Sequence, residues 1–359
     1  MSKEKLSVSR MNCWNTCQLK HLYAYDYGVR RAMDGDALVF GNAFHKAMEV
    51  RAKGADSQQA FEAACATIPK DWQGEESTFE FFVAKLQAAV WAYFTVWTDD
   101  IIAQMEPEIE FTYPIDGSRT FEAAGKIDGI AHLKDGRIAL VEHKTTSEPI
   151  EEADAAYWKR LRLNFQLCRY VKGAKACGKE IETVIYDVFH KPALKPKDAV
   201  KEVDENGIPF VMTKDANGND VRCIKRDCQP KKSADTAKGE FYYTRPETPE
   251  EFGQRLRDDM VARPGFYFQR REVTVTDEQL EAFSLAEQQM ARQILSVRAD
   301  SREAEKKGIP ACAAFMQNVS HLTCPYCDYE NLCMAGRTIA PGEVPDGFKY
   351  TGATPELSN

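Results

Sequence analysis

The sequence predicts an α/β fold, because helical and strand patterns alternate through the middle of the chain. Three strand patterns lie between residues 108 and 146, and turns of the Asp-Gly type at 116–117 and 135–136 separate them. Helical patterns lie on both sides and a further apolar run follows at 182–190, so the central order is helix, three strands, helix, strand. With 359 residues, 43% hydrophobic and 28% charged, the chain is long enough for one large elaborated domain or two small ones.

The first helix is expected over residues 37–53 and carries His45. An aromatic-rich stretch at 78–105 predicts a long core helix, which Pro107 should end because proline cannot continue a helix. Another helical pattern, at 151–176, follows the three strands. The other predicted elements are strands at 108–115, 121–133, 137–146 and 182–190, an inserted hairpin or long loop at 192–240, and helices at 246–263 and 276–307.

The formal net charge of −8 argues mildly against a nucleic-acid partner, because phosphate binding needs Lys and Arg side chains. A basic stretch between residues 188 and 232 offsets this, as either a local binding surface or a solvated loop. No apolar run approaches the roughly 20 residues that span a membrane, and the polar start does not resemble a signal peptide. The eleven cysteines, an odd number, favour a reducing cytoplasm, where clustered cysteines bind metals.

The predicted hairpin at 121–146 contains charges that a core hairpin would not carry. Glu142 and Lys144 project on one face, because alternate residues of a strand share a face. If the strands pair about the turn at 134–136, with Asp128 opposite Lys144, Asp128 lies near Glu142. Two neighbouring carboxylates repel unless a cation lies between them, and their oxygens suit Mg²⁺ or Mn²⁺. The alternative is a surface Glu–Lys pair on an edge strand, with Asp128 beside the turn.

Two further features accompany these charges. His45 lies on the predicted upstream helix, and Gln166 and Tyr170, four residues apart, share one face of the downstream helix. With Asp128 in "GKIDG", a Glu-x-Lys in "VEHKT" and the helix motif in "QLCRY", the chain resembles the RecB-like branch of the PD-(D/E)XK nuclease superfamily. The order of these motifs, and their places on helix, strand, strand and helix, agree with that branch.

The resemblance implies metal-dependent hydrolysis of phosphodiester bonds in DNA. The ligands of Mg²⁺ or Mn²⁺ would be His45, Asp128 and Glu142, with the backbone carbonyl of His143 as a further ligand. The expected activity is that of an exonuclease that processes DNA ends in recombination or repair and passes single strands to an annealing or recombination protein. The alternative is a catalytically silent or partner-dependent scaffold subunit that binds DNA ends.

The resemblance also implies roles for residues that do not bind the metal. Lys144 would position the attacking water and stabilise the developing charge. Gln166 and Tyr170 would hold the DNA backbone or support Lys144. An upstream acid on the first strand is usual in the superfamily, and Glu110 is the candidate, with Glu108 as the second choice.

The C-terminal part contains three clustered cysteines, Cys324, Cys327 and Cys333, in "CPYCDYENLC". Two thiolates three residues apart hold one metal ion well, and zinc with His321 as the fourth ligand is one interpretation. A zinc-stabilised interaction protein is the function that this interpretation favours.

The N-terminal stretch "LSVSRMNCWNTCQLKHLYAYDYG" supports a second interpretation of the cysteines. It resembles the start of iron–sulfur RecB-like nucleases, of the AddB type and the CRISPR-associated type. The resemblance implies a [4Fe–4S] cluster held by four thiols. They are Cys17, Cys324, Cys327 and Cys333, with Cys13 as the alternative to Cys17. Gln18 follows Cys17 where the family usually has proline, which leaves the choice between Cys13 and Cys17 open.

The implied fold is a restriction-endonuclease-like core, a mixed central sheet flanked by helices, whose N- and C-terminal helical segments are joined by the cluster. The setting that the resemblance favours is a phage or prophage protein in the bacterial cytoplasm. The predicted parts are a single nuclease domain over residues 1–359, a catalytic core at 106–190, a polar and basic insertion at 192–240, a cysteine segment at 308–334 and a tail at 335–359.

Overall fold

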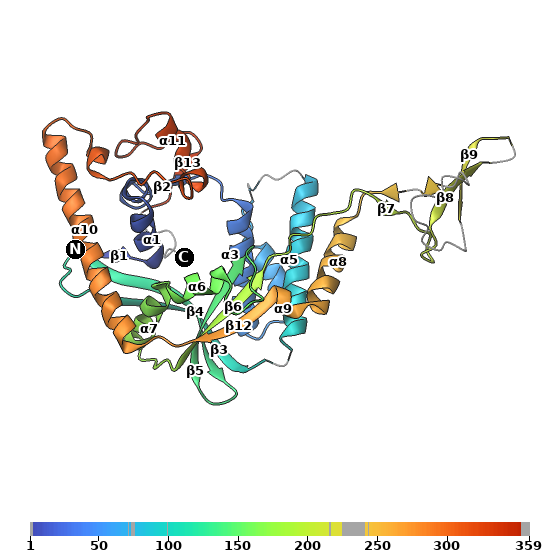
Figure 1. Cartoon of the computed structure of the whole chain (residues 1–359), viewed down its shortest axis with the longest axis horizontal. Helices are drawn as coiled ribbons and strands as arrows, with labels where there is room; N and C mark the ends of the chain where they lie inside the picture. The colour runs from blue at the N-terminus through green and yellow to red at the C-terminus, as the bar shows by residue number, and fades with distance from the viewer. Residues whose placement is uncertain are drawn as a thin grey trace. The chain divides into compact units, whose positions relative to one another are not determined.

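A computed structural model of the chain describes residues 3–70, 72, 76–98, 100–214, 217–224, 241–242 and 244–352 (Figure 1). The chain divides into two compact units. The first contains Met1–Trp72, Trp97–Lys191 and Gly265–Asn359, and the second contains Gln73–Val96 and Pro192–Pro264. Both parts of the second unit are therefore insertions in the sequence of the first.

A six-stranded mixed sheet forms the centre of the first unit. Its strands are β1 (Glu4–Leu6), β3 (Ile102–Pro114), β4 (Phe121–Leu133), β5 (Ile138–Thr146), β6 (Thr183–His190) and β12 (Phe268–Val273). β4 pairs antiparallel with β3 along one edge, so β1 and β5 share its other edge. β1 pairs there with residues 121–123 and β5 with residues 129–132, which leaves residues 124–128 between them. β5 runs parallel to β6, and β12 is antiparallel to β6, so the predicted mixed sheet is confirmed.

Helices flank this sheet (Figure 1), and α3 and α7 contact its strands directly. The helices of the first unit are α1 (Val8–Thr16), α2 (Gln18–His21), η1 (Leu22–Asp26), α3 (Asp36–Ala52), α4 (Ser57–Cys65), α6 (Ala156–Arg162), α7 (Gln166–Ala176), α10 (Asp277–Lys306), η3 (Ala311–Ala314), η4 (Cys324–Tyr326) and α11 (Glu330–Met334). The short helix α9 (Pro264–Tyr267) leads into β12. Within the described ranges, no helix is long and apolar enough to cross a membrane.

Two glycines allow α7 to lie close to the sheet. Phe111 of β3 lies between them, because a Cβ atom added at Gly125 of β4 or at Gly173 of α7 would be 2.5 Å from its ring. The Phe111 side chain is only 4% exposed, so this contact lies in the core. A larger side chain at either glycine would push α7 away from β3 and β4. The fit of one ring between two glycines therefore fixes the position of α7.

The two terminal segments of the first unit pack against each other (Figure 1). Strand β2 (Val29–Arg31) pairs antiparallel with β13 (Phe348–Tyr350). The Asn318 side-chain amide donates to the Thr16 carbonyl at 2.9 Å. The Tyr329 hydroxyl donates to the carbonyl of Val29, 300 residues away in sequence, at 2.5 Å. The ends of the unit are therefore joined by backbone and side-chain hydrogen bonds.

A buried polar network connects α10 to α7. Glu287 of α10 is 2% exposed and accepts a hydrogen bond from the Tyr113 hydroxyl at 3.0 Å. Two cations of α7 approach the same carboxylate, since Lys172 donates to it and Arg169 lies 3.4 Å away. Arg169 is fully buried and also donates to the Leu6 carbonyl of β1 at 2.8 Å. The network thus ties α7, α10, β1 and β3 together.

The second unit contains a helix pair and short strands. The helices α5 (Glu76–Val96) and α8 (Pro249–Ala262) pack through Phe81 and Phe252, whose ring centroids are 5.5 Å apart. The strands are β7 (Val200–Lys201), β8 (Phe210–Lys214), β9 (Asp220–Ile224), β10 (Phe241–Tyr242) and β11 (Thr244–Arg245). β8 and β9 form an antiparallel hairpin, the first of the two alternatives, hairpin or long loop, that the sequence predicted for this insertion. The basic residues and Cys228 between 225 and 240 lie outside the described residues.

Two predicted helices differ from the structure, and one observed strand was not predicted. The helix predicted at 78–105 ends at Val96, and Pro107 lies inside β3, where an edge strand tolerates a missing amide hydrogen. The helix predicted at 151–176 is two helices, α6 and α7, because the Asn164 side chain accepts from the Gln166 amide and begins a new helix there. Strand β12 was not predicted, because three charged residues interrupt its apolar pattern.

Replacing Glu287 by alanine should destabilise the protein, because the fully buried Arg169 then loses its carboxylate partner. Removing one partner of a buried ion pair costs about 3–5 kcal/mol, so we expect the free energy of unfolding to fall by ~3 kcal/mol or more. Urea denaturation of Glu287→Ala, with Glu281→Ala as the exposed control on the same helix, measures the difference. A loss below ~1 kcal/mol, typical of a surface pair, would contradict a structural role for the network.

Candidate active site

The predicted carboxylate pair lies at the fork where β4 and β5 stop pairing. Gly129 and Val141 form the last backbone pair, and the His143 amide then donates to Oδ2 of Asp128 at 2.8 Å. The next position of this register places Asp128 opposite Glu142. Residues opposite each other in an antiparallel pair project on the same face, so the fork holds two carboxylates together.

The register differs from the predicted one by two residues, so the same face of β5 still meets Asp128. The sequence predicted a turn that placed Asp128 opposite Lys144, which is wrong, because the register is centred on Asp135. The Asp135 carboxylate accepts from the Arg137 amide at 3.0 Å and tightens the turn. The turn itself is the predicted one, since the Leu133 amide donates to the Arg137 carbonyl at 2.9 Å across residues 134–136, and this turn places Glu142, rather than Lys144, opposite Asp128.

Glu142 is the more deeply buried carboxylate of the fork, at 1% exposure. Burial, and then the charge of Asp128, raise its pKa to about 7. Its Oε1 accepts from Nζ of Lys144 at 2.5 Å, whereas its buried Oε2 has no hydrogen-bond partner among the described residues. A buried carboxylate oxygen without a donor, next to a second carboxylate, fits a divalent cation.

His45 of α3 completes the acidic end of the fork. Its Nδ1 lies 3.5 Å from Oδ2 of Asp128. Burial, the largest single effect, acts to lower the pKa of His45, but the charge and hydrogen bond of Asp128, together with the charge of Glu142, outweigh it and the net shift is upward. Burial acts to raise the pKa of Asp128, and His45 reverses this, so that pKa is lowered. Gly41 of α3 faces β5, since a Cβ added there would be in ordinary van der Waals contact with the Thr145 hydroxyl at 3.4 Å.

A line of hydrogen bonds runs from the fork to α7. Lys144 donates from Nζ to Oε1 of Gln166 at 2.9 Å as well as to Glu142. Gln166 then donates from Nε2 to the Tyr170 hydroxyl at 3.0 Å. The ring of Tyr170 lies edge-on to Phe111, with centroids 5.9 Å apart. The structure therefore brings together the residues that were predicted on the strand and on the helix.

The opposite face of β5 is supported by a second polar group, which sequence reasoning missed. His143 is 4% exposed, and its Nδ1 lies 3.4 Å from Oδ2 of Asp187 on β6. Arg270 of β12 approaches the same carboxylate, with Nε at 3.1 Å. The signal for this group was an aspartate inside the otherwise apolar run "VIYDVFH". A metal-binding role for the His143 carbonyl stays a prediction.

Of the two candidate upstream acids, Glu108 lies nearer the fork. It occupies the position opposite Asp128, between the pairs that Pro107 and Ile109 form with β4, and its φ of 57° is unusual for a residue with a side chain. Its carboxylate pairs with Lys126. Glu110 is exposed and lies opposite Lys126 in the register. The geometry therefore favours Glu108, the second choice of the sequence analysis.

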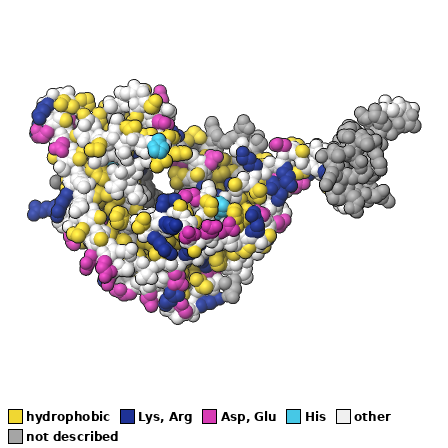
Figure 2. Space-filling model, in the orientation of Figure 1, with side chains coloured by type: hydrophobic (Ala, Val, Ile, Leu, Met, Phe, Trp, Pro, Cys, Tyr) yellow, Lys and Arg dark blue, Asp and Glu magenta, His cyan; other side chains and the backbone are white. Residues whose placement is uncertain are grey.

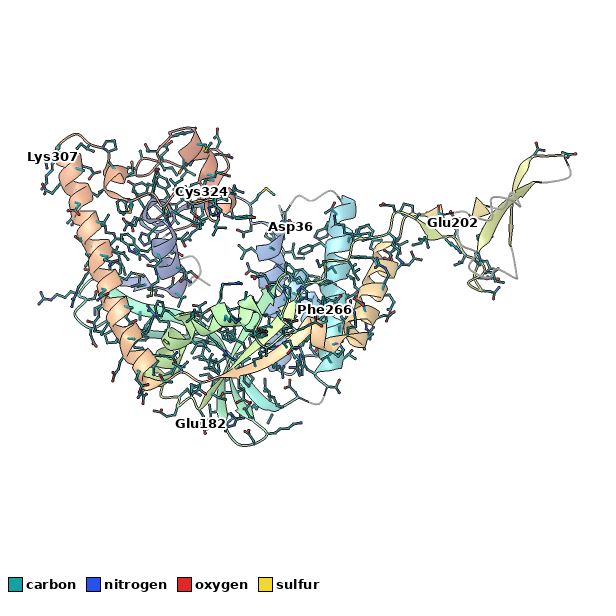
Figure 3. All side chains as sticks on the ribbon, viewed as in Figure 1. Asp36, Glu182, Glu202, Phe266, Lys307 and Cys324 are labelled. Carbon is teal, nitrogen blue, oxygen red and sulfur yellow. The ribbon has the colours of Figure 1, made fainter. Side chains whose placement is uncertain are left out.

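The predicted cluster thiols come from both ends of the chain and lie within electrostatic range of one another. Burial raises the pKa of Cys333, and the charges of Cys327, Cys17 and Cys324 add to the shift. Cys13 lies close as well, since burial raises its pKa to about 12 with a contribution from Cys17. Figure 3 shows Cys324 in the C-terminal segment of the first unit.

These thiols are not arranged as a finished metal site. Searching the described part of the chain finds no three His, Cys, Asp or Glu side chains already gathered as metal ligands, either here or at the fork. The donor set itself, several thiols within electrostatic range, suits a metal cluster. His321, the alternative zinc ligand, is exposed. The side chains of Cys223 and Cys228 lie outside the described residues.

Comparison with models of known protein families assigns the chain to a superfamily. The family model described as PD-(D/E)XK nuclease superfamily matches residues 5–334. The chain belongs to the PD-(D/E)XK nuclease superfamily. Members are nucleases, hydrolases that act on DNA, and they generally use Mg²⁺ or Mn²⁺. The superfamily prediction is thus confirmed.

Other comparisons add little to the superfamily assignment. A comparison with curated proteins gave no match. Among solved structures, one described as "Crystal structure of SSO0001" matches 73% of this chain and 77% of its own, with 11% identity and a TM-score of 0.23. Likeness at this level carries no argument about function. The RecB-like branch, the iron–sulfur cluster and the phage origin stay predictions.

Mn²⁺ should stabilise this superfamily member more at pH 8 than at pH 6. In the metal-free protein the pKa of Glu142 is about 7 against its usual 4.5, so this group favours folding below 4.5 and that contribution is lost as pH rises through 7. At pH 6 a cation must displace the proton, whereas at pH 8 it meets two carboxylates. Thermal unfolding with and without Mn²⁺ at both pH values measures the shift. Glu142→Gln should abolish it, and an equal shift at both pH values would contradict the assignment.

Proposed function

We propose that this chain is a Mg²⁺- or Mn²⁺-dependent deoxyribonuclease of the RecB-like branch that digests DNA from its ends. The observation that carries the proposal is the line of hydrogen bonds from Glu142 through Lys144 and Gln166 to Tyr170, beside Asp128. A surface Glu–Lys pair on an edge strand would not be 1% exposed at the glutamate. It would also lack a second carboxylate on the same face. These contacts support a catalytic role over the surface alternative.

The proposed mechanism assigns a task to each group of the fork. Asp128, Glu142 and neutral His45 would hold the metal ion, which supplies Lewis acidity to the phosphate and lowers the pKa of a bound water. Because the carboxylates beside it raise the pKa of His45, binding of a metal ion to this histidine would require the loss of its proton. Glu110, or more directly Glu108, is the proposed upstream acid.

Lys144 is the proposed positioning group for the attacking water. Burial acts to lower its pKa, but Glu142 and Asp128 outweigh that effect and the net shift is upward, so it stays a cation. Its charge would stabilise the phosphorane-like transition state. Gln166 accepts a hydrogen bond from the ammonium and keeps it directed at the fork, and Tyr170, which accepts from Gln166, orients Gln166 in turn. The two helix residues thus act on the reaction through Lys144.

We also propose a [4Fe–4S] cluster on Cys17, Cys324, Cys327 and Cys333, with a structural role. The support is that Cys17 lies between α1 and α2, with its Sγ 3.9 Å from the Met316 carbonyl of the C-terminal segment. A cluster at this place would cross-link segments that already touch. Its cross-link would close nearly the whole chain, and long loops are where a cross-link constrains the unfolded state most.

The biological setting of the proposal is end processing during DNA recombination or repair, in a phage or prophage context in the bacterial cytoplasm. The partner would be a single-strand annealing or recombination protein. The parts of the proposed single nuclease domain are the catalytic core at 106–190, the insertion at 192–240, the cysteine segment at 308–334 and the tail at 335–359.

Lys144→Ala should abolish metal-dependent cleavage. Removing a group that stabilises the transition-state charge costs about 10²–10³-fold in rate. The assay uses anaerobically purified protein on 5′- and 3′-labelled duplex and single-stranded DNA, with Mg²⁺, Mn²⁺ or EDTA. Lys175→Ala, an exposed lysine of α7, is the matched control and should cleave normally. No cleavage of any substrate by folded wild-type protein would instead favour the silent end-binding scaffold.

Cys17→Ser should remove the iron and labile sulfide of the protein, and Cys13→Ser should retain them. The reason is that a cubane cluster needs all four thiolates, whereas Cys13 lies beside the proposed set. Iron and sulfide analysis, with the visible absorption of the brown cluster, measures both variants. Loss of iron and sulfide in Cys13→Ser, but not in Cys17→Ser, would make Cys13 the fourth ligand in place of Cys17. If the wild-type protein is colourless and contains zinc, the cluster proposal is wrong and the zinc site with His321 as the fourth ligand is favoured.

A further inference from the structure

A pocket of about 300 Å³ lies beside α1 in the first unit. Four polar residues of this helix line it, at the spacing of a single helical face. They are Ser9, Asn12, Cys13 and Thr16. The other face of α1, which includes Met11 and Trp14, is buried in the core. Since Ser9 and Asn12 are exposed, the polar face is open to a ligand from solvent.

Two cations lie across the pocket from this polar face. They are Lys20 of α2 and Arg30 of β2, and the Arg30 guanidinium stands 4.6 Å from the centroid of the Tyr25 ring, which holds it in place. Among the described lining residues the one acid is Asp328, and its carboxylate forms an ion pair with Arg31 at 3.5 Å. The pocket is therefore locally positive in a chain whose net charge is −8.

We propose that this pocket binds a phosphate group of a DNA strand, and this inference rests on the proposed nuclease function. Cationic side chains together with hydroxyl and amide donors are the groups that contact phosphate oxygens in protein–DNA interfaces. Arg30, whose Nη1 also donates to the Thr351 hydroxyl at 3.4 Å, supplies a guanidinium charge and Lys20 a point charge. An acidic nuclease needs local basic sites to hold its substrate, because neutralising phosphates supplies most of the affinity for DNA. The pocket is separate from the fork, so it holds the strand away from the scissile bond.

The phosphate pocket and the proposed cluster use different side chains. Of the described residues that line the pocket, Cys13 alone carries a thiol, whereas the proposed cluster uses Cys17 and the C-terminal cysteines. Substitutions of Lys20 or Asn12 should therefore change DNA binding and leave the iron content unchanged.

Fluorescence anisotropy tests the pocket with the full chain in EDTA, where no cleavage occurs. The probes are fluorescein-labelled single-stranded and duplex oligonucleotides. Lys20→Gln removes one charge, and Asn12→Asp adds a carboxylate of the same shape. Lys307→Gln, at the C-terminal end of α10 (Figure 3) and outside the pocket lining, is the control. We expect about five- to tenfold weaker binding for the two pocket variants. The slope of log K against log salt should fall by about 0.7 for single strands or 0.9 for duplex in Lys20→Gln.

The outcomes separate the pocket from the nuclease site. Binding by both pocket variants that equals that of Lys307→Gln overturns the proposal. If wild-type protein never cleaves DNA but binds it in a Lys20-dependent manner, the proposed nuclease function fails and the pocket stands. Calorimetric titration with inorganic phosphate tests whether the pocket binds free phosphate rather than a DNA strand. Lys20-dependent binding of free phosphate, with DNA binding unaffected by Lys20→Gln, overturns the assignment to a DNA strand.

Discussion

Repulsion between two carboxylates at the fork of β4 and β5 is the interaction on which the rest of the candidate site depends. Asp128 stays ionised because His45 faces it, and Glu142, buried next to it, has its pKa raised to about 7. Lys144 neutralises one oxygen of Glu142 and leaves the other without a partner among the described residues. A protein that holds this arrangement in its folded state is prepared for a cation, because binding relieves the repulsion that folding imposes.

The fold prevents the two carboxylates from moving apart. The His143 amide holds Asp128, and β6 pairs with β5 along its full length, so the strand that carries Glu142 cannot shift. On the helix side, Phe111 is fitted between two glycines and keeps α7 against the sheet. Figure 2 shows Lys, Arg, Asp and Glu side chains interspersed on the visible face of the first unit, without one continuous basic surface. Local sites such as the α1 pocket therefore matter more for DNA than the overall charge.

Much of the site was predictable, because its chemistry is concentrated in short motifs on regular elements. Alternation and Asp-Gly turns placed β4 and β5 within a residue of their observed bounds, and the spacing of Gln166 and Tyr170 placed them on one helical face. Features that depend on tertiary contacts were not predictable. A strand as polar as β12 is stable only because β6 pairs with it. The role of Asp187 depends on its contact with His143 of the neighbouring strand. The register error of two residues came from placing the centre of the pairing at residue 136, whereas a three-residue turn at 134–136 is centred on Asp135.

The order of the elements along the chain also bears on the synthesis of the protein. β12 and α10 follow the second unit in sequence, yet β12 pairs with β6 and Glu287 of α10 binds Arg169 and Lys172 of α7. Farther along α10, Arg298 pairs with Glu4, which precedes it by almost 300 residues in the sequence. On the ribosome, Asp128, Glu142 and Lys144 therefore emerge long before the segments that hold their scaffold in place. A nascent chain therefore carries every motif residue of the fork before β12 and α10 have been made, so the scaffold of the site is completed only after those segments emerge.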